Sequence, residues 1–541
     1  PFYTESDTEV IIALYDRFGI DFVSLLNGQF AIALYDIRLK KTFLIRDRVG
    51  IAPLFYHSSG DTVYFASEVK ALLVTGKVPA RLNTDAFFDF IHLWSVLAPD
   101  TLFTGIKQVS PGCYVEIDQT GISTKRYWDF DFQPSDEQSI DDAVEKLDQL
   151  LDDAVKIRLR SDVPVGAYLS GGLDSTIILS YLTRQGADLE TFSLTFDDAQ
   201  LNEESFQSEV IRYFSTRHHS YRADYQLIAD NFIKTIWHTE SPLFRTSPTP
   251  MMLLSSEVHA NNFKVVLTGE GADEIFGGYD IFKEAKIRQF WSRNPESSWR
   301  PLLLKRLYPY LDFNKINSIA YLKNTFGHNL SHTNSLSYAF NTRANITSAV
   351  KNFMQPDIKH QMDLDLELRL QEHIPIAAGQ FGVFNTAQYV ESRTIMAGYI
   401  LSSQGDRMLM ANSVEGRYPF LDHRVIEFAG GLKNSFKMNG LNEKYILKQM
   451  VKERIPASVL KRPKQPYRAP DINALMQSKD NQLLDFLSED QIRKNALFDP
   501  AKVTRLVNKA IKGRAQSVKD NMLFTNILST QIWVEKFIQP Y

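Results

Sequence analysis

A glycine-rich loop with three hydroxyl side chains and one carboxylate is the clearest chemical feature of the sequence. Residues 170–176 read Ser-Gly-Gly-Leu-Asp-Ser-Thr and stand between a predicted strand at 165–169 and a predicted helix at about 175–183. The glycines let the backbone approach an anion, and the hydroxyls and the N–H groups at the helix start can donate to phosphate oxygens. The loop therefore predicts a phosphate site, although it lacks the spacing of a Walker A or a dinucleotide loop. The structural alternative is a glycine turn with Asp174 or Ser175 as helix cap.

A second loop, residues 268–279, follows another apolar stretch and carries three carboxylates in Thr-Gly-Glu-Gly-Ala-Asp-Glu-Ile-Phe-Gly-Gly-Tyr. Asp174 would repel phosphate unless it holds a Mg²⁺ ion that bridges the phosphates, and Asp273 is the second candidate ligand for that ion. Glu270 is the candidate base that takes a proton from an incoming amine. The alternative is that Asp273 and Glu274 only favour a helix N-terminus through its dipole.

The elements around both loops alternate between strands and helices. This order predicts a doubly wound parallel sheet, whose ligands lie beyond the carboxyl ends of the strands. From about residue 281 onward helical patterns dominate and no strand is predicted. The predicted strands are 165–169, 191–196, 218–222 and 263–268, and the predicted helices lie around 175–183, 203–215 and 226–238.

The first 130 residues have a different pattern. Residues 6–9, Ser-Asp-Thr-Glu, predict a capping box that opens a helix, with Gly19 as its stop. Residues 128–139 are rich in Asp, Pro, Ser and Gln, so we expect a domain boundary between residues 130 and 131. Between the helix and this boundary, antiparallel hairpins are predicted from strands at 29–37, 42–46, 53–57 and 62–66.

Length and composition restrict the class of protein. A chain of 541 residues predicts two or more domains, and 44% hydrophobic with 23% charged residues excludes global disorder. The formal charge of −4 disfavours nucleic acid as a main partner. The single cysteine, Cys113, excludes an internal disulfide and favours a reducing compartment. With no apolar run of about 18 residues and no leader pattern, we expect a soluble cytoplasmic protein that does not enter a membrane.

Taken together, the two loops resemble those of the glutamine-hydrolysing asparagine synthetases, members of the ATP-pyrophosphatase group. The resemblance covers nearly the whole chain. It implies a truncated N-terminal Ntn-hydrolase-like αββα domain over residues 1–130, of the glutaminase type. A doubly wound, parallel-sheet ATP-pyrophosphatase domain with a helical C-terminal part would follow over residues 131–541. Further matching stretches are 402–408, 414–422, 443–447 and 462–466.

In that family ATP and Mg²⁺ activate L-aspartate as β-aspartyl-AMP, and ammonia from glutamine or from free ammonium displaces AMP to give L-asparagine. The resemblance carries roles over to particular residues of this sequence. Ser170, Gly171, Gly172, Leu173, Asp174 and Ser175 would hold the pyrophosphate, and Leu169, Leu194, Thr268 and Gly269 would line the adenosine pocket. Asp174 and Asp273 would bind Mg²⁺, Glu270 would receive a proton from ammonia, Lys444 would stabilise the transferring phosphoryl group, and Asp7 would bind the α-amino group of glutamine.

Other charged side chains allow both a functional and a structural interpretation. Arg245 lies where the family binds its amino-acid substrate and could pair with an α-carboxylate, but a structural salt bridge is the alternative. Without the resemblance, Lys444 would be a solvent-facing lysine. A basic loop is either a phosphate-binding segment or a solvated surface, and it contains Lys461, Arg462, Lys464 and Arg468.

The sequence departs from the family pattern at its start. The family uses an N-terminal cysteine as nucleophile for glutamine hydrolysis, whereas this sequence begins with Pro1. Cys113 falls late in the first domain on a predicted strand, so we reject it as the nucleophile and expect a buried thiol. We expect the sequence to be part of a longer chain, with its glutaminase half inactive as given. A naturally short protein is the alternative.

Three functions remain open at this stage. The first is asparagine synthesis, and the second is an adenylating amide ligase for another acid, such as a peptide, sugar or natural-product precursor. The surroundings of Arg245 and the segment 324–365 would decide between these two. The third is an ATP-binding regulatory protein without turnover. The expected partners are small molecules, ATP, L-aspartate, L-glutamine or ammonia, and a homodimer stays open.

Overall fold

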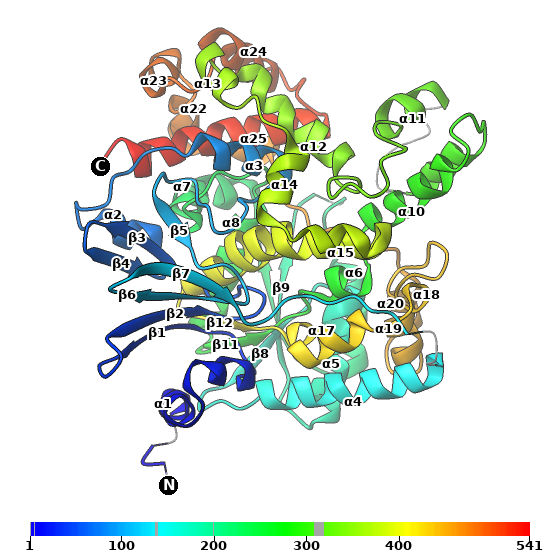
Figure 1. The fold of residues 1–541 in the computed structure, drawn as a ribbon. Coiled ribbons are helices and arrows are strands. Elements are labelled where there is room, and N and C mark those ends of the chain that lie inside the picture. Colours follow the sequence, from blue (N-terminus) through cyan, green and yellow to red (C-terminus); the bar gives the residue numbers. More distant parts are fainter. Residues whose placement is uncertain (1, 5, 136–138, 199, 308–318, 541) are drawn as a thin grey trace.

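Two antiparallel sheets form the middle of the N-terminal part of the protein (Figure 1). The computed structural model describes all residues except 1, 5, 136–138, 199, 308–318 and 541. The first sheet has the order β1 (Ala31–Asp36), β2 (Lys41–Arg46), β6 (Cys113–Asp118) and β7 (Gly121–Arg126). The second has the order β4 (Thr62–Ala66), β3 (Phe55–Ser59) and β5 (Ile106–Gln108). The predicted hairpins β1–β2 and β3–β4 are confirmed as antiparallel pairs.

The two sheets pack against each other through an apolar layer that includes Leu44, Tyr56 and Val115. Helix α1 (Asp7–Phe18) and the 3-10 helix Gly19–Leu25 cover the outer side of the first sheet. Helices α2 (Val69–Leu73) and α3 (Thr84–Leu93) pack beside β3 on the other side. These residues therefore form four layers, helix–sheet–sheet–helix.

The start of α1 agrees only in part with the predicted capping box. Ser6 is the N-cap, and its hydroxyl accepts a hydrogen bond from the N–H of Thr8. The Glu9 carboxylate, however, accepts from the N–H groups of Tyr3 and Thr4 at 2.8 and 2.7 Å. The reciprocal half of the box is therefore wrong, because the chain before the helix folds back and supplies nearer donors.

A five-stranded parallel sheet forms the centre of the remaining chain, in the order β10-β9-β8-β11-β12. The predicted sheet is confirmed, but β12 was not predicted, because three residues paired with a single neighbour leave no alternation to recognise. The strands are β8 (Val165–Tyr168), β9 (Glu190–Thr195), β10 (Arg217–Arg222), β11 (Val265–Leu267) and β12 (Glu415–Arg417).

Helices cover both faces of this sheet, as the doubly wound arrangement requires. One face packs against α4 (Ile140–Arg158), α5 (Leu173–Arg184), α6 (Glu204–Phe214), α17 (His423–Gly430) and α19 (Tyr445–Val451). The other packs against α7 (Tyr225–Thr239), α8 (Pro248–Ala260) and α16 (Arg407–Met410). Neighbouring residues of β8 point to opposite faces of the sheet, so Ala167 packs in the core on the first face and Tyr168 in the core on the second.

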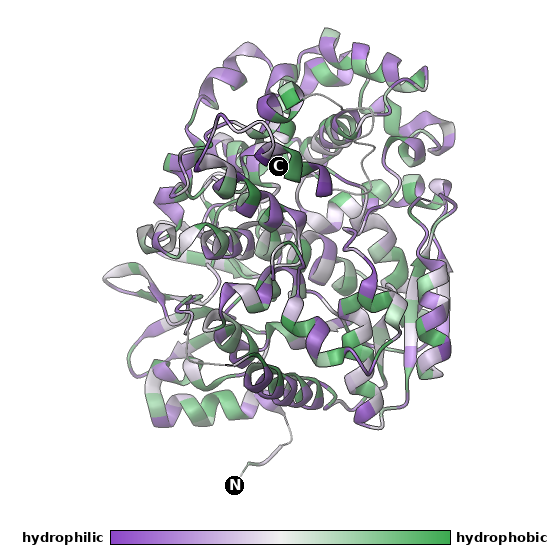
Figure 2. Ribbon diagram, turned by 90° about the vertical axis from the view of Figure 1, so that its right-hand side faces the viewer, coloured by the Kyte–Doolittle hydropathy of each residue, from purple (hydrophilic) through white to green (hydrophobic). Residues whose placement is uncertain are grey.

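The chain after β11 is mainly helical, as predicted. Most helices in Figure 2 carry both green and purple stretches, the colouring of helices with one buried side. Among the described residues, none of the helices combines the length and apolarity needed to cross a membrane. These helices are α9 (Ala272–Phe276), α10 (Asp280–Ser292), α11 (Ile319–Phe326), α12 (Asn341–Thr347), α13 (Pro356–Gln361), α14 (Leu366–His373), α15 (Gly382–Glu391), the π-helix Ser392–Asp406, α18 (Asn434–Lys437), α20 (Ala457–Lys461), α21 (Ile472–Leu475), α22 (Gln482–Asp485), α23 (Glu489–Asn495), α24 (Pro500–Ile511) and α25 (Val518–Trp533).

Buried polar contacts join the N-terminal sheets to the rest of the chain. The carboxylate of Glu240 accepts from the N–H groups of Val69 and Lys70 at 2.9 and 2.7 Å, and so caps α2 from a distant part of the sequence. Asp422 accepts from the side chain of Asn27 at 3.0 Å. Helix α2 therefore depends on a carboxylate that its own sequence does not supply.

Candidate active site

The two chemically marked loops meet at one edge of the parallel sheet. Strands β8 and β11 are parallel neighbours, with Ala167 opposite Leu267. The loop 169–172 leaves the carboxyl end of β8, and the loop 268–271 leaves the carboxyl end of β11. The sheet therefore places both loops side by side, as the sequence predicts.

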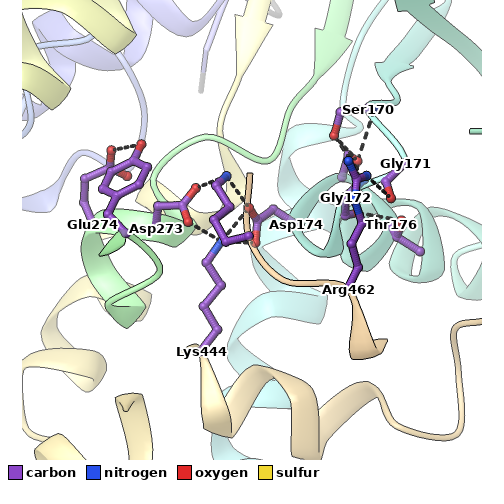
Figure 3. Close-up of polar contacts among 12 residues, drawn as sticks. Ser170, Gly171, Gly172, Asp174, Thr176, Asp273, Glu274, Lys444 and Arg462 are labelled. Carbon is purple, nitrogen blue, oxygen red and sulfur yellow. Dashed lines mark hydrogen bonds and ion pairs between the residues drawn. The ribbon is translucent and has the colours of Figure 1, made fainter. Parts of the chain in front are cut away.

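The first loop is built around close backbone approach. Gly171 has φ +70°, and a Cβ there would lie 2.8 Å from the amide nitrogen of Gln207. The hydroxyls of Ser170 and Ser175 lie 3.1 Å apart, and the N–H of Gly172 donates to Ser170 Oγ at 3.2 Å. Ser170, Gly171 and Gly172 lie together with Thr176 at the start of α5 (Figure 3). The geometry suits an anion, because hydroxyl and backbone N–H donors converge at the start of a helix, with the Arg462 guanidinium beside them.

Two lysines and two aspartates form a buried charge cluster beside this loop. Lys444 Nζ lies 2.6 Å from both carboxylate oxygens of Asp174 and 2.6 Å from Asp273 Oδ1. Lys464 Nζ lies 2.5 Å from Asp273 Oδ2. Figure 3 shows Asp174, Asp273 and Lys444 pointing toward one another from three separate elements. The carboxylates of Asp174 and Asp273 therefore face a common point, which the ammonium group of Lys444 occupies.

Burial and ion pairing set the protonation of this cluster. Burial raises the pKa of Asp174, and the nearby Asp273 carboxylate adds to that rise. Burial also acts to raise the pKa of Asp273, but Lys444 and Lys464 together outweigh it and lower that pKa. Desolvation opposes the charge of Lys464, yet the pKa of Lys464 is raised because Asp273 and Asp174 stabilise its ammonium. The cluster therefore holds its charges only as a mutually compensating set.

Backbone features bring the cluster together. Lys444 is the residue before α19 and adopts φ +50°, which directs a lysine that is only 2% exposed into the site. A Cβ on Gly278 would lie 2.0 Å from Asp273 Oδ1 and 2.2 Å from Lys444 Cε. A Cβ on Gly269 would lie 2.9 Å from the Cβ of Asp174. The glycines of the second loop are therefore required for close contact with both carboxylates.

Glu270 lies in the same loop and has a carboxylate oxygen that accepts no hydrogen bond in the described chain. Burial raises its pKa, and Asp174 contributes in the same direction. Within the part of the chain that the structure describes, Oε2 of Glu270 is buried and has no hydrogen-bond partner. A buried carboxylate with a raised pKa and a free oxygen is suited to accept a proton from an incoming amine.

The donor set at this site fits Mg²⁺ with bound nucleotide phosphates. Across the described residues no group of three or more His, Cys, Asp or Glu side chains could hold a metal ion. Mg²⁺ commonly uses only one or two carboxylates and takes its other ligands from substrate phosphates and water. Asp174 and Asp273 provide two such carboxylates at one point, next to the phosphate loop.

Several residues predicted for the site lie outside this cluster. Leu169 is buried in the core on one face of the sheet and Leu194 in the core on the other, so their side chains do not share one surface. Arg245 donates to Asp471 Oδ2 at 2.6 Å, which is the structural salt bridge left open above. Asp7 is exposed in the first turn of α1. Their predicted binding roles stay predictions.

The structure also adds residues that the sequence patterns left unassigned. Lys464 had two interpretations, and its ion pair with Asp273 places it in the charge cluster, with the side chain 25% exposed. Arg462 of the same basic loop donates to the carbonyl oxygen of Gly171 at 3.2 Å. The hydroxyl of Tyr279 donates to Glu274 at 2.8 Å. The run of basic residues was the sequence signal for Lys464 and Arg462. No sequence pattern indicated the contact between Tyr279 and Glu274.

Cys113 is buried on β6, as predicted. Burial raises the pKa of its thiol. A thiol nucleophile needs access and a low pKa, so Cys113 is unsuited to that role.

Comparison with known proteins agrees with this geometry. The family model described as asparagine synthase matches residues 146–535, and the model described as a glutamine amidotransferase domain matches residues 1–128. Amidase chyE of Penicillium rubens is 30% identical over 512 residues, covering 87% of this chain and 73% of that protein. Asparagine synthetase [glutamine-hydrolyzing] 1 of Bacillus subtilis is 29% identical over 508 residues, covering 91% and 75%. Amidase chry2 of Gibberella zeae is 28% identical over 515 residues, covering 87% and 73%.

Proposed function

Since the chain belongs to the glutamine-hydrolysing asparagine synthetase family, whose members carry out ATP-dependent amidation, we propose that it amidates L-aspartate to L-asparagine through β-aspartyl-AMP. The observation that carries the proposal is the cluster of Asp174, Asp273, Lys444 and Lys464 beside an anion-binding loop and the buried Glu270. The chemistry of adenylation needs these parts together.

The first half-reaction uses the phosphate loop and the charge cluster. The loop amides and the hydroxyls of Ser170 and Ser175 bind the departing pyrophosphate of ATP. Asp174 and Asp273 would hold Mg²⁺, which when bound neutralises phosphate charge. Lys444 and Lys464 then pair with phosphate oxygens in place of the carboxylates. The aspartate side-chain oxygen attacks the α-phosphorus, and the bond to pyrophosphate breaks with its electron pair leaving on pyrophosphate.

The second half-reaction needs a proton acceptor. The nitrogen of ammonia forms a bond to the acyl carbon of the adenylate, and the bond from that carbon to the AMP oxygen breaks. The proton lost by the attacking nitrogen goes to Glu270, whose buried Oε2 has no other partner in the described chain. A raised pKa makes Glu270 a better acceptor than an ordinary glutamate.

The proposal extends to the N-terminal domain. Residues 1–130 would form an Ntn-hydrolase-like glutaminase domain, followed by the synthetase domain at 131–541, and Asp7 would bind the α-amino group of glutamine. The four layers of helices and sheets and the amidotransferase match support this. The reducing environment favoured by a single cysteine supports a cytoplasmic location. Assembly as a homodimer stays an open part of the proposal.

A second candidate is amidation of a different carboxylic acid with the same adenylating chemistry. The two fungal amidases are as similar to this chain as the bacterial asparagine synthetase is. In addition, Arg245 is engaged with Asp471, so a substrate α-carboxylate would have to compete with that ion pair. Both observations favour testing other acids beside L-aspartate.

The experiment is pyrophosphate release from Mg·ATP and ammonium, with and without L-aspartate. The wild type is compared with Asp174→Ala and with Asp61→Ala, an exposed loop aspartate. We expect release that requires L-aspartate, survives in Asp61→Ala and is lost in Asp174→Ala, with asparagine as product. A folded wild type that binds ATP but shows no aspartate-dependent release would refute L-aspartate as the substrate. Release with another acid would then support the second candidate.

A further inference from the structure

The short helix that carries Asp273 cannot hold its own position. Helix α9 has five residues and lies between Gly271 and Gly277, both in the left-handed region. A helix of this length leaves most of its carbonyl oxygens without an intrahelical N–H partner. The place of Asp273 therefore depends on contacts from outside the helix.

Gln388 of α15 supplies those contacts. Its Nε2 donates to the carbonyl oxygens of Glu274 and Ile275 at 2.7 and 2.8 Å. These carbonyls belong to the two residues that follow Asp273, and the Gln388 side chain is fully enclosed. One amide group thus satisfies two carbonyls of the last turn and fixes the helix against α15.

Lys437 of α18 fixes the orientation of that amide. Its Nζ donates to Gln388 Oε1 at 3.0 Å and to Asn385 Oδ1 at 3.4 Å. Because lysine has no acceptor in its charged form, the oxygen of the Gln388 amide must face Lys437. The amide nitrogen must then face α9. The rings of Phe132 and Phe384 close the site around Lys437 Nζ at 5.1 and 5.8 Å.

We propose that Lys437 and Gln388 are positioning residues that hold α9 so that Asp273 faces Asp174 at the spacing needed for Mg²⁺ and ATP. The inference rests on the proposed function. It assigns a role to a lysine and a glutamine that lie 164 and 115 positions beyond Asp273 in the chain.

The burial of Lys437 makes its charge costly, and its hydrogen bonds to buried amides are what offset that cost. Lys437 is 0% exposed, and among the described residues no carboxylate acts on its charge. Burial lowers the pKa of Lys437 to about 7, so folding works against its charge. An apolar side chain of similar length would avoid that cost beside the rings of Phe132 and Phe384, but it would leave the buried amide oxygens of Gln388 and Asn385 without a donor. Lys437 therefore uses its buried hydrogen bonds to orient the Gln388 amide, and through that amide it acts on α9.

The test uses Lys437→Met and Gln388→Leu, with Lys351→Met and Gln531→Leu as controls in other parts of the fold. Lys351 lies over the ring of Phe88, and Gln531 is buried in α25 next to Asn495. Three quantities are measured for each protein: the Mg²⁺ concentration at half-maximal pyrophosphate release, the Kd of Mg·ATP by calorimetry, and the thermal midpoint.

We expect the half-maximal Mg²⁺ concentration and the Kd to rise 10- to 100-fold in both Lys437→Met and Gln388→Leu. The midpoint of Lys437→Met should stay close to that of the wild type, because a buried charge is removed while the buried amide oxygens of Gln388 and Asn385 lose their donor. The controls should bind Mg·ATP as the wild type does. A wild type without turnover would refute the proposed function only, because the calorimetric comparison still tests the positioning role. Unchanged Mg·ATP binding in folded Lys437→Met would overturn the inference. The inference would also fail if the control variants lost Mg·ATP binding to the same extent and if, in all four variants, that loss came with a lowered thermal midpoint.

Discussion

Gly278→Ala is the sharpest perturbation of the charge cluster that the structure offers. Gly278 does not have a positive φ, so alanine meets no backbone strain there. Its Cβ, however, would lie 2.0 Å from Asp273 Oδ1 and 2.2 Å from Lys444 Cε. The single methyl group therefore acts on the two side chains that face Asp174 and on little else.

The expected loss follows from the required movement. A Cβ essentially never lies within 3.0 Å of such a neighbour, so Asp273 must retreat by 3.0 − 2.0 = 1.0 Å and Lys444 by 3.0 − 2.2 = 0.8 Å. A displacement of about 1 Å at reacting groups costs on the order of 100-fold in rate. We therefore expect Gly278→Ala to lower the rate of ATP-dependent amidation about 100-fold while the protein remains folded.

The assay is pyrophosphate release at saturating Mg·ATP, acid substrate and ammonium, together with thermal unfolding. Gly28→Ala and Gly431→Ala serve as controls, since a Cβ at Gly28 meets nothing within 4 Å and one at Gly431 makes an ordinary contact of 3.6 Å. Both controls should retain wild-type rates. A rate for Gly278→Ala within about threefold of wild type would refute the reasoning, because the cluster would then tolerate a shift of 1 Å.

Three further predictions concern buried ionisable side chains. Asp422 is fully buried and accepts from Arg158 at 2.9 Å, so Asp422→Asn should cost about 3–5 kcal/mol of unfolding free energy in urea at pH 7 by leaving Arg158 unpaired. Burial acts to raise the pKa of Asp422, but its Arg424, Arg158 and Asn27 partners outweigh burial and lower that pKa. The stability it contributes is therefore present above pH ~4 and lost as the pH falls further, and the gap between wild type and variant should narrow there. The pKa of Lys437 falls from 10.5 to about 7 on folding, so between these pH values the unfolded chain binds more protons than the folded protein. The unfolding free energy of the wild type should therefore rise with pH across this window. Lys437→Met should not show this rise, because methionine does not titrate. Cys113→Ala should leave pyrophosphate release unchanged, and the wild-type thiol should resist iodoacetamide until the protein is denatured; rapid alkylation of the native protein would contradict its burial.

Local sequence patterns predicted much of the fold and the centre of the site. The alternation of strands and helices over residues 165–268 and the hairpins of the N-terminal part have short-range periodicities that the backbone geometry imposes. The two loops are contiguous in sequence, so their glycines, hydroxyls and carboxylates could be recognised together. The presence of Asp174, Glu270 and Asp273 at one sheet edge followed from the parallel order of β8 and β11.

The tertiary structure alone decided the contacts between distant segments. Strand β12, the cap that Glu240 provides to α2 and the engagement of Arg245 with Asp471 involve partners with no shared periodicity.

The sequence by itself thus determined which residues could carry phosphate and proton chemistry, because that information lies in short motifs. Only the packing of the chain decided that Lys464 joins Lys444 at the carboxylates, and that Gln388 and Lys437 brace α9. These pairings join residues between 49 and 191 positions apart, and the partner of a side chain at such a distance is set by how helices pack, not by its neighbours in sequence.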